Sequence, residues 1–200
     1  PTATNTAGSQ RLTAGNKISS AVRSRGAILI WTDTALYQMQ FIGPPFTFGF
    51  KQLGDNCGAV GSDAAIDVSG MTYWMGNDSF FTFDGAVKKI PCSVQDYVFD
   101  DINKNALNEV FCASNSDFNE IIWFYPSADS LQIDRHVTYN YAENLWCTGS
   151  LSRSTWADRG VYPNPYATEF DSSDTTSTIS TIYGNKSGRT FVYAHEEGVN

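Results

Sequence analysis

Tryptophan-bearing strand segments recur along this chain at a similar spacing. Trp31, Trp74 and Trp123 each lie in a short run of aliphatic and aromatic residues, and they are 43 and 49 residues apart. Each run is followed by turn residues such as Thr, Gly, Asn, Asp or Pro, and then by a second run. Runs of this kind, bounded by turn residues, are typical of antiparallel strands. The sequence therefore predicts an all-β chain made of repeated units.

Repeats of about 40 to 50 residues, each with a few antiparallel strands, are typical of β-propeller blades. A four-stranded sheet buries both faces when it packs between neighbouring sheets, and large aromatic side chains fill the space between them. We expect a β-propeller with blades at residues 23–70, 71–118 and 119–165 and an incomplete blade at 166–200, after a polar, basic arm at 1–22. The alternative is a β-sandwich with irregular hairpins.

Individual strands can be assigned within each unit. The predicted strands are Ala27–Trp31 and Ala35–Phe41 in the first unit, Met71–Trp74 and Ser79–Phe83 in the second, Glu120–Tyr125, Leu131–Ile133 and Val137–Tyr141 in the third, and Ile179–Tyr183 and Arg189–His195 in the fourth. Residues 184–188 are a predicted turn, and residues 44–58 and 168–181 are predicted long loops. Apolar residues at intervals of four predict one short helix over Tyr97–Glu109.

Composition and charge exclude several classes of protein. Charged residues make up 17% of the chain and aromatic residues 14%, whereas disordered chains combine low hydrophobicity with high charge. The net charge is −8, but the segment up to Arg25 has four bases and no acid, so the remainder carries −12. So acidic a surface binds nucleic acid poorly, because affinity for phosphate comes from Lys and Arg. The longest aliphatic run, Ala27–Trp31, is far shorter than the roughly 20 apolar residues that span a bilayer, so we expect no membrane-spanning segment.

No pattern in the sequence indicates catalytic, cofactor-binding or metal-ligating residues. The four cysteines form no CxxC pair, and the two histidines, His136 and His195, lack the spacing of a metal site. Cys92, Cys112 and Cys147 adjoin apolar strand segments. We therefore expect these three to be small buried hydrophobic side chains without disulfides.

Two sets of residues bear on a carbohydrate function. Glycoside hydrolysis needs two carboxylates that flank the scissile bond, but in a chain with 21 acids chance proximity explains the acidic pairs. Aromatic side chains could stack on sugar rings, although aromatic residues at a period of two in a strand are more often packing. A carbohydrate-binding β-propeller for host attachment is thus the alternative function, and a glycosidase is the least favoured. The acidic pairs are Asp100 with Asp101, Glu109 with Glu120 and Glu196 with Glu197, and the aromatic set is Tyr125, Tyr139, Tyr141 and Trp146.

Three passages between Arg23 and Pro165 combine strand and turn residues in a recognisable order. They are Ala27–Asp33 with Leu36–Gly43; Gly54–Gly58 with Asp67–Gly76 and Phe83–Gly85; and Glu120–Pro126 with Val137–Glu143, Trp146 and Trp156–Gly160. In their order and spacing they resemble the propeller-forming tail proteins of tailed phages, the tail nozzle or tail tubular protein B type and their hub relatives. The closing segment His195–Gly198 also looks like the next hairpin in such proteins.

The resemblance implies a non-enzymatic virion component of the phage tail, assembled in the host cytoplasm. Such proteins form a closed homo-oligomeric ring, hexameric by family resemblance, around the DNA exit channel. The implied neighbours are the head–tail adaptor and the tail fibre or spike proteins, and genomic DNA would pass without specific binding. The predicted loops at 44–58 and 168–181 would make subunit contacts. Because such proteins are several-fold longer, we expect this chain to be part of a longer polypeptide.

Overall fold

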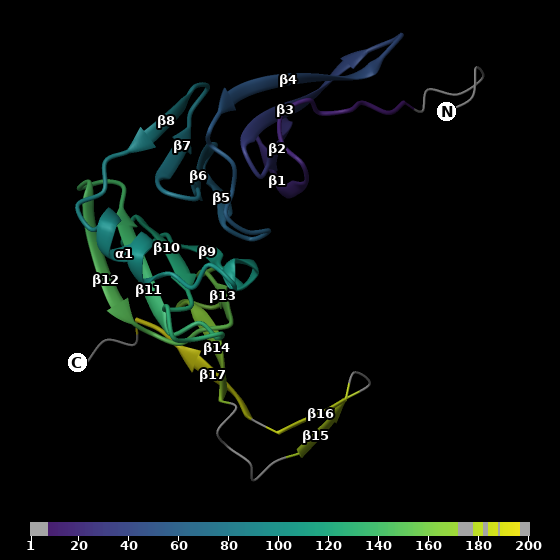
Figure 1. Cartoon of the computed structure of the whole chain (residues 1–200). Coiled ribbons are helices and arrows are strands. Elements are labelled where there is room, and N and C mark those ends of the chain that lie inside the picture. The colour runs from purple at the N-terminus through teal and green to yellow at the C-terminus, as the bar shows by residue number, and fades with distance from the viewer. Residues whose placement is uncertain (1–7, 172–177, 182–183, 188, 197–200) are drawn as a thin grey trace.

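Figure 1 shows a computed structural model of the chain, which describes residues 8–171, 178–181, 184–187 and 189–196. The described residues form antiparallel sheets that follow one another along the chain and lie in an arc. We number them sheets 1 to 4, and a separate hairpin of β15 (Thr178–Thr181) and β16 (Gly184–Ser187) lies between two strands of sheet 4 in the sequence. The predicted all-β class is therefore confirmed. Among the described residues, no helix is long and apolar enough to cross a membrane.

Sheets 1 to 3 are meanders, because strands that are adjacent in the sequence are also hydrogen-bonded neighbours. Sheet 1 contains β1 (Ile18–Ser24), β2 (Ala27–Thr32), β3 (Ala35–Gly43) and β4 (Thr47–Asp55); sheet 2 contains β5 (Ala65–Val68), β6 (Met71–Met75), β7 (Phe80–Phe83) and β8 (Val87–Ile90); sheet 3 contains β9 (Phe111–Asn115), β10 (Glu120–Tyr125), β11 (Arg135–Asn140) and β12 (Leu145–Ser150); sheet 4 contains β13 (Thr155–Ala157), β14 (Tyr166–Asp171) and β17 (Arg189–Ala194). Helix α1 (Gln95–Asp101) and a 3₁₀ turn at Leu107–Glu109 connect sheets 2 and 3.

Matching two-residue turns join the first and second strands of sheets 1 and 2. Arg25 and Gly26 have φ angles of 46° and 79°, and Ser69 and Gly70 have φ angles of 54° and 83°. Positive φ at both central residues is typical of the type I′ turn, whose twist matches that of antiparallel strands. Glycine at the second position adopts this conformation without a Cβ clash. These local turns set the pairing of the first strands, although β1 itself is a polar segment.

Alternate residues of the central sheets pack against opposite neighbours. In β6, Trp74 belongs to the core shared with sheet 1, whereas Tyr73 and Met75 belong to the core shared with sheet 3. In β10, Trp123 packs toward sheet 2 and Phe124 packs toward sheet 4. Because successive side chains of a strand point to opposite faces, sheets 2 and 3 bury both of their faces. Three hydrophobic cores therefore join the four sheets in succession.

The three spaced tryptophans occupy the second strands of sheets 1, 2 and 3, and all three are fully buried. The ring centroids of Trp31 and Trp74 are 5.3 Å apart, in an edge-to-face arrangement. The indole N–H of Trp74 donates to the Cys57 carbonyl at 2.8 Å, and that of Trp123 donates to the Ala64 carbonyl at 3.1 Å. The sequence spacing of these tryptophans therefore corresponds to a structural repeat.

The sheets begin 5 to 11 residues earlier than the predicted units. Sheets 1 to 4 begin at Ile18, Ala65, Phe111 and Thr155, whereas the predicted units begin at residues 23, 71, 119 and 166. The first strands are short or polar, so they lack the long apolar runs that mark the second strands. The predicted arm at residues 1–22 therefore contains most of β1, while residues 1–7 lie outside the described residues.

The helix predicted over Tyr97–Glu109 is wrong in extent. Helix α1 ends at Asp101, because Ile102 takes an extended conformation with a ψ of 133°, and only a short 3₁₀ turn follows. Val98, Ile102 and Ala106, which suggested the helix, are all buried. The spacing of these three residues therefore indicates that they share one buried side of the segment. It does not indicate a continuous helix.

The loops and one strand predicted from turn residues also differ from the structure. Within the predicted loops, residues 47–55 form β4 and residues 168–171 belong to β14; residues 184–187 of the predicted turn form β16, and the predicted strand Leu131–Ile133 lies in a loop. Residues 179–181 were predicted both in the long loop and in the strand Ile179–Tyr183, and they lie in β15. Gly, Asn, Ser and Thr in these strands resemble turn residues, and pairing with a neighbouring strand outweighs this local preference. Residues 172–177, 182–183 and 188 lie outside the described residues.

Candidate interaction surface

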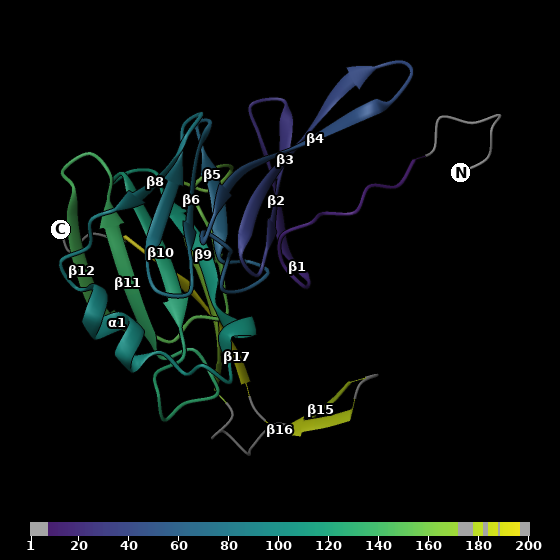
Figure 2. The same cartoon turned by 45° about the horizontal axis from the view of Figure 1, so that its top comes forward.

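The β3–β4 hairpin extends beyond the rest of sheet 1 (Figure 2). β2 pairs with β3 only between Leu36 and Met39, whereas β3 continues to pair with β4 as far as Gly43 and Thr47. The end of this hairpin therefore has two strands and no third strand beside it. Two-stranded ribbons of this kind bury little surface by themselves.

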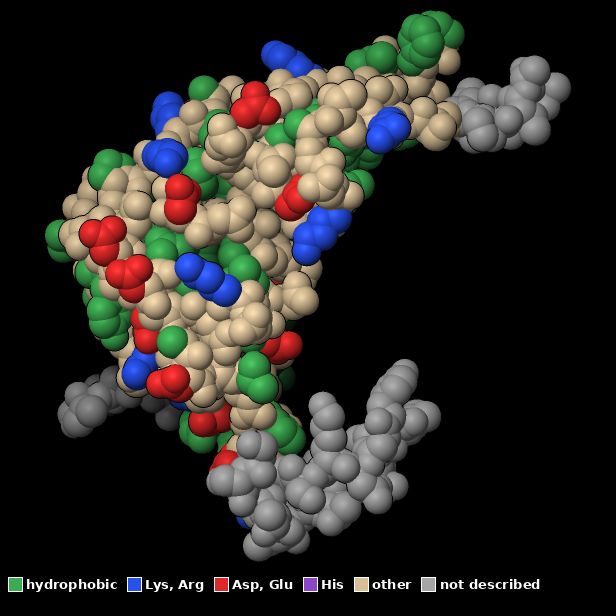
Figure 3. Space-filling model, viewed as in Figure 1, with side chains coloured by type: hydrophobic (Ala, Val, Ile, Leu, Met, Phe, Trp, Pro, Cys, Tyr) green, Lys and Arg blue, Asp and Glu red, His purple; other side chains and the backbone are tan. Residues whose placement is uncertain are grey.

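The end of the hairpin is apolar and exposed to solvent. Phe46 is 76% exposed and Phe41 is 65% exposed, and the rings of Phe41 and Phe48 lie edge to face at 6.0 Å. Figure 3 shows hydrophobic side chains gathered at the end of the projecting hairpin. Contiguous exposed apolar groups mark interaction surfaces, because water contact with them is unfavourable. We call Phe41, Ile42, Phe46, Phe48 and Phe50 the aromatic tip.

The described start of the chain runs beside the same hairpin. Residues 8–10 and the side chains of Met39, Phe48 and Phe50 border a groove of about 290 Å³. Farther along, the Asp33 carboxylate accepts a hydrogen bond from the backbone N–H of Asn16 at 2.8 Å, and this bond lowers the pKa of Asp33. The part of the N-terminal segment that the structure describes is therefore anchored at sheet 1 and borders the aromatic tip without covering it.

A second hollow lies where the first strands of the four sheets meet. β1 contacts β5, β5 contacts β9, and Asp63 forms an isolated parallel bridge with Phe111. A depression of about 540 Å³ is bordered by residues from all four first strands, including Val22, Ala65, Phe111 and Thr155. The four sheets therefore share one inner edge, and their other strands lie farther from it.

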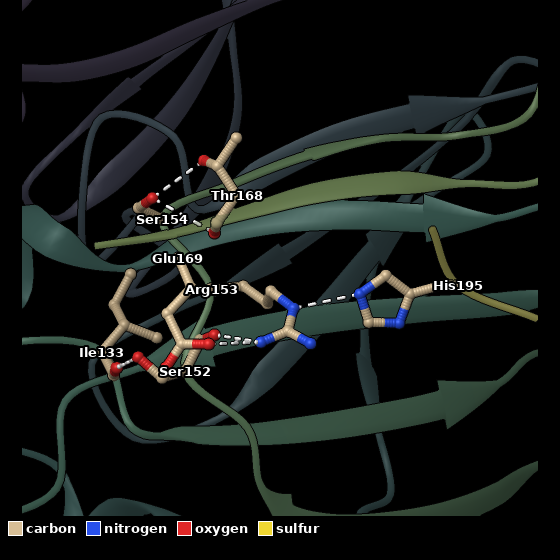
Figure 4. Close-up of polar contacts among 7 residues, drawn as sticks. All are labelled: Ile133, Ser152, Arg153, Ser154, Thr168, Glu169 and His195. Carbon is tan, nitrogen blue, oxygen red and sulfur yellow. Dashed lines mark hydrogen bonds and ion pairs between the residues drawn. The ribbon is translucent and has the colours of Figure 1, made fainter. Parts of the chain in front are cut away.

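Arg153 joins the end of β17 to β14 through a set of polar contacts (Figure 4). Its guanidinium donates to a Glu169 carboxylate oxygen at 3.1 Å, to the Ser152 carbonyl at 2.6 Å and to Nε2 of His195 at 3.0 Å. It also lies over the Tyr193 ring, 4.2 Å from the centroid. Burial and the nearby Arg153 lower the pKa of His195. This cluster binds protein groups to one another and acts as a structural junction.

The four aromatic residues considered for sugar stacking lie at the packing between sheets 2 and 3. Tyr125 and Tyr139 are buried. The Trp146 ring stacks on Tyr139 at 4.6 Å, and Tyr141 stacks on Tyr73 at 5.9 Å. The structure brings these residues together, but Tyr125 is fully buried and the rings of Tyr139, Tyr141 and Trp146 face other rings of the protein.

The structure brings together two carboxylates that the sequence did not pair. The side-chain amide of Asn115 donates to Glu120 at 3.3 Å and to Glu196 at 3.2 Å. Burial and the nearby Glu196 raise the pKa of Glu120. The predicted partner of Glu120, Glu109, instead lies in the 3₁₀ turn beside the shared inner edge. Sequence reasoning missed the contact because Glu120 lies in β10 and Glu196 follows β17, far away in the sequence.

Asp100 and Asp101 are adjacent residues at the end of helix α1. Asp101 forms an ion pair with Arg135 at 3.7 Å, and Glu197 lies outside the described residues. In the part of the chain that the structure describes, no group of three or more His, Cys, Asp or Glu side chains could hold a metal ion.

All four cysteines are described, and all are free thiols. Cys57 is buried, Cys92 and Cys112 are half-buried, and Cys147 is exposed. The prediction that Cys147 is buried was wrong, because β12 is the edge strand of sheet 3. Burial raises the pKa of the Cys57, Cys92 and Cys112 thiols, which makes them weak nucleophiles at neutral pH.

The aromatic tip was missed because Pro44 and Pro45 suggested a loop across residues 44–58. The signal that could have found it is the alternation of Phe46, Phe48 and Phe50 with small or polar residues after that turn, which is typical of a strand.

Comparison with known protein families found no family that matches this chain, and comparison with curated proteins found no matching protein.

Proposed function

We propose that this chain is a structural component of a phage tail, a nozzle or hub protein that forms an oligomeric ring around the DNA exit channel. The observation that carries the proposal is the aromatic tip. It is an exposed apolar hairpin on a molecule in which Trp31, Trp74 and Trp123 are fully buried between sheets. A ring subunit needs such a surface, because only contact with another protein removes these side chains from water.

We also infer that the sheets are blades of a β-propeller. The support is their consecutive packing: each inner sheet buries one face against the preceding sheet and the other against the following one. A β-sandwich would pack two sheets face to face around a single core. The shared inner edge formed by the first strands also favours the propeller.

In this proposal the protein has an architectural role and no catalytic residues. The proposed neighbours are the head–tail adaptor and the tail fibre or spike proteins, and the proposed location is the virion tail after assembly in the host cytoplasm. The net charge of −8 would keep passing DNA from binding, because phosphate contacts need Lys and Arg. The resemblance across Arg23–Pro165 supports these neighbours and this location.

The location of the protein in a particle tests the proposal. Purified virions are analysed for this chain by mass spectrometry, and electron cryomicroscopy images are searched for its density. We expect copies in a ring below the adaptor. Absence from virions, combined with saturable quenching of tryptophan fluorescence by host-surface glycans, would reject the tail role and favour the carbohydrate-binding alternative.

A further inference from the structure

Buried polar atoms without a hydrogen-bond partner gather where α1 meets sheet 3. Among the described residues there are six such side-chain atoms in the molecule, and three of them are Tyr125 Oη, Asp101 Oδ2 and Arg135 Nε. A buried polar atom without a partner costs free energy, so native structures contain few of them. Three in one place therefore call for a physical explanation. The other three are Trp31 Nε1, Thr82 Oγ1 and Asn115 Oδ1, one in each of sheets 1, 2 and 3.

Strand pairing and the path of the chain after α1 bring these three side chains together. Tyr125 and Arg135 are directly opposite each other in β10 and β11, so their side chains lie on the same face of sheet 3. The segment after α1 runs beside them, because the Asn103 N–H donates to the Pro126 carbonyl at 3.0 Å. Asp101, the last residue of α1, forms its ion pair with Arg135. Helix and sheet therefore meet at the three unpartnered atoms.

The three atoms lie near one another but do not bond to one another directly. Arg135 Nε and Asp101 Oδ2 are 3.7 Å apart, whereas an N–H···O hydrogen bond spans about 2.7–3.2 Å. The Tyr125 side chain is fully buried, and burial together with the nearby Asp101 carboxylate raises the pKa of its hydroxyl. A single small molecule can therefore contact all three groups at once.

The chemistry of the three groups selects a neutral ligand that both donates and accepts hydrogen bonds. The Arg135 Nε–H donates, the Asp101 oxygen accepts, and the Tyr125 hydroxyl can do either. A cation would meet the Arg135 guanidinium and an anion would meet the Asp101 carboxylate, and both contacts are unfavourable. The neighbouring Asp134 carboxylate already accepts hydrogen bonds from the Ser127 N–H and hydroxyl, both at 2.7 Å.

We propose that this junction binds one water molecule, which accepts from Arg135 Nε, donates to Asp101 Oδ2 and bonds to the Tyr125 hydroxyl. About three hydrogen bonds are typical of a buried water molecule in a protein. The water ties the end of α1 to β10 and β11, so it fixes the connection between sheets 2 and 3 to sheet 3. The site lies within one chain, so it does not depend on the assembly role proposed above.

Tyr125→Phe tests the site by the sign of its effect on stability. Removing a buried hydroxyl that has no partner raises stability, because its desolvation cost disappears, whereas removing one that bonds to a bound water lowers stability. We expect Tyr125→Phe to raise the equilibrium constant for unfolding about two- to tenfold, the effect of one net hydrogen bond. Urea unfolding followed by circular dichroism measures this constant.

Thr82→Val is the matched control, since Thr82 Oγ1 is the one atom of this kind in sheet 2 among the described residues. It should leave stability unchanged or raise it. A high-resolution crystal structure of the unaltered chain tests the site directly, and we expect a solvent peak within about 2.6–3.2 Å of all three atoms. The proposal is wrong if Tyr125→Phe leaves stability unchanged or raises it, if the three side chains bond to one another directly, or if no solvent peak contacts them.

Discussion

At the scale of single residues, equivalent tryptophans make unequal contacts. The indole N–H of Trp74 has a carbonyl partner, whereas the indole N–H of Trp31 is buried and has no hydrogen-bond partner among the described residues. Both rings fill the core between sheets 1 and 2. The pair therefore separates the contribution of ring packing from that of the hydrogen bond.

Replacing Trp74 by Phe should lower the free energy of unfolding by about 1–3 kcal/mol more than replacing Trp31 by Phe. The loss of ring volume is common to both variants, but only Trp74→Phe leaves the buried Cys57 carbonyl without its indole donor. Urea unfolding followed by circular dichroism measures both changes. Equal losses would mean that the hydrogen bond adds nothing beyond packing.

The contact between Arg153 and His195 predicts a pH dependence of stability. The pKa of His195 is lower in the folded protein than in the unfolded chain, because of burial and of Arg153. Between these two values the unfolded chain binds more protons, so stability rises with pH. Stability is therefore complete above the usual histidine pKa of about 6.5 and is lost as pH falls below it.

Thermal unfolding at about pH 7.5 and about pH 5.5 should show a smaller acid-induced loss for His195→Gln than for the unaltered chain. Glutamine keeps a hydrogen-bond acceptor for Arg153 but does not titrate in this range. Burial also lowers the pKa of His136, so His136→Gln is the control that leaves the His195 contribution in place. An unchanged acid-induced loss in His195→Gln would contradict the assignment.

At the scale of elements, sheet 4 is joined to sheet 3 by fewer large side chains than the other sheets are to one another. The Trp156 ring packs near Phe124 at 5.9 Å and His195 at 4.7 Å, and its indole N–H donates to the Ser114 carbonyl at 2.9 Å. The Asp158 carboxylate accepts the Ser114 hydroxyl at 2.9 Å. These few contacts make the junction sensitive to a single change.

Trp156→Ala should loosen sheet 4 while sheet 2 stays protected. Because Trp156 is half-buried, we expect a loss of about 3 kcal/mol at most, the low end for tryptophan truncation in a core. Hydrogen exchange with mass spectrometry should show faster exchange in β13, β14 and β17 and unchanged exchange in β6 and β7. Uniformly faster exchange across the chain would instead show that the four sheets unfold as one unit.

At the scale of the whole molecule, the inner sheets 2 and 3 are packed on both faces, whereas the end sheets 1 and 4 are packed on one. Among the described residues, sheets 2 and 3 each pack against a sheet on both faces, whereas sheets 1 and 4 each pack against a sheet on one face only. The charge is also unequal along the arc, with the bases in excess only in the first sheet. The first sheet therefore differs from the rest of the molecule in the sign of its net charge.

Association of copies should slow as ionic strength rises. Opposite charges steer the basic first sheet toward an acidic surface, and salt screens this attraction over about 8–10 Å at physiological concentrations. Stopped-flow light scattering at several salt concentrations measures the rate constant. Lys51→Gln, next to Phe50 in β4, should reduce both the rate and its salt dependence, and a rate that does not vary with salt would contradict the electrostatic argument.

How much of the fold was predictable differs between strands. β2, β6 and β10 were predicted because each combines a run of aliphatic and aromatic residues with a following turn. β1 was missed because its buried Ser20 and Ser24 are polar; Ser20 donates to the Ser62 carbonyl at 2.6 Å and Ser24 accepts from Thr72 at 3.1 Å. Partners of this kind lie far away in the sequence, so a local pattern does not reveal them.

The all-β class and the tryptophan repeat were determined by the sequence alone, because they depend on side-chain alternation and backbone preferences within a few residues. Which aromatic side chains become core and which become surface was decided only by tertiary structure. Phe81 is 3% exposed and Phe50 is 38% exposed, although both are phenylalanines in strands. Phe81 packs in the core between sheets 1 and 2, whereas Phe50 lies on the open face of sheet 1, and burial depends on what packs against a face and not on the residue that occupies it.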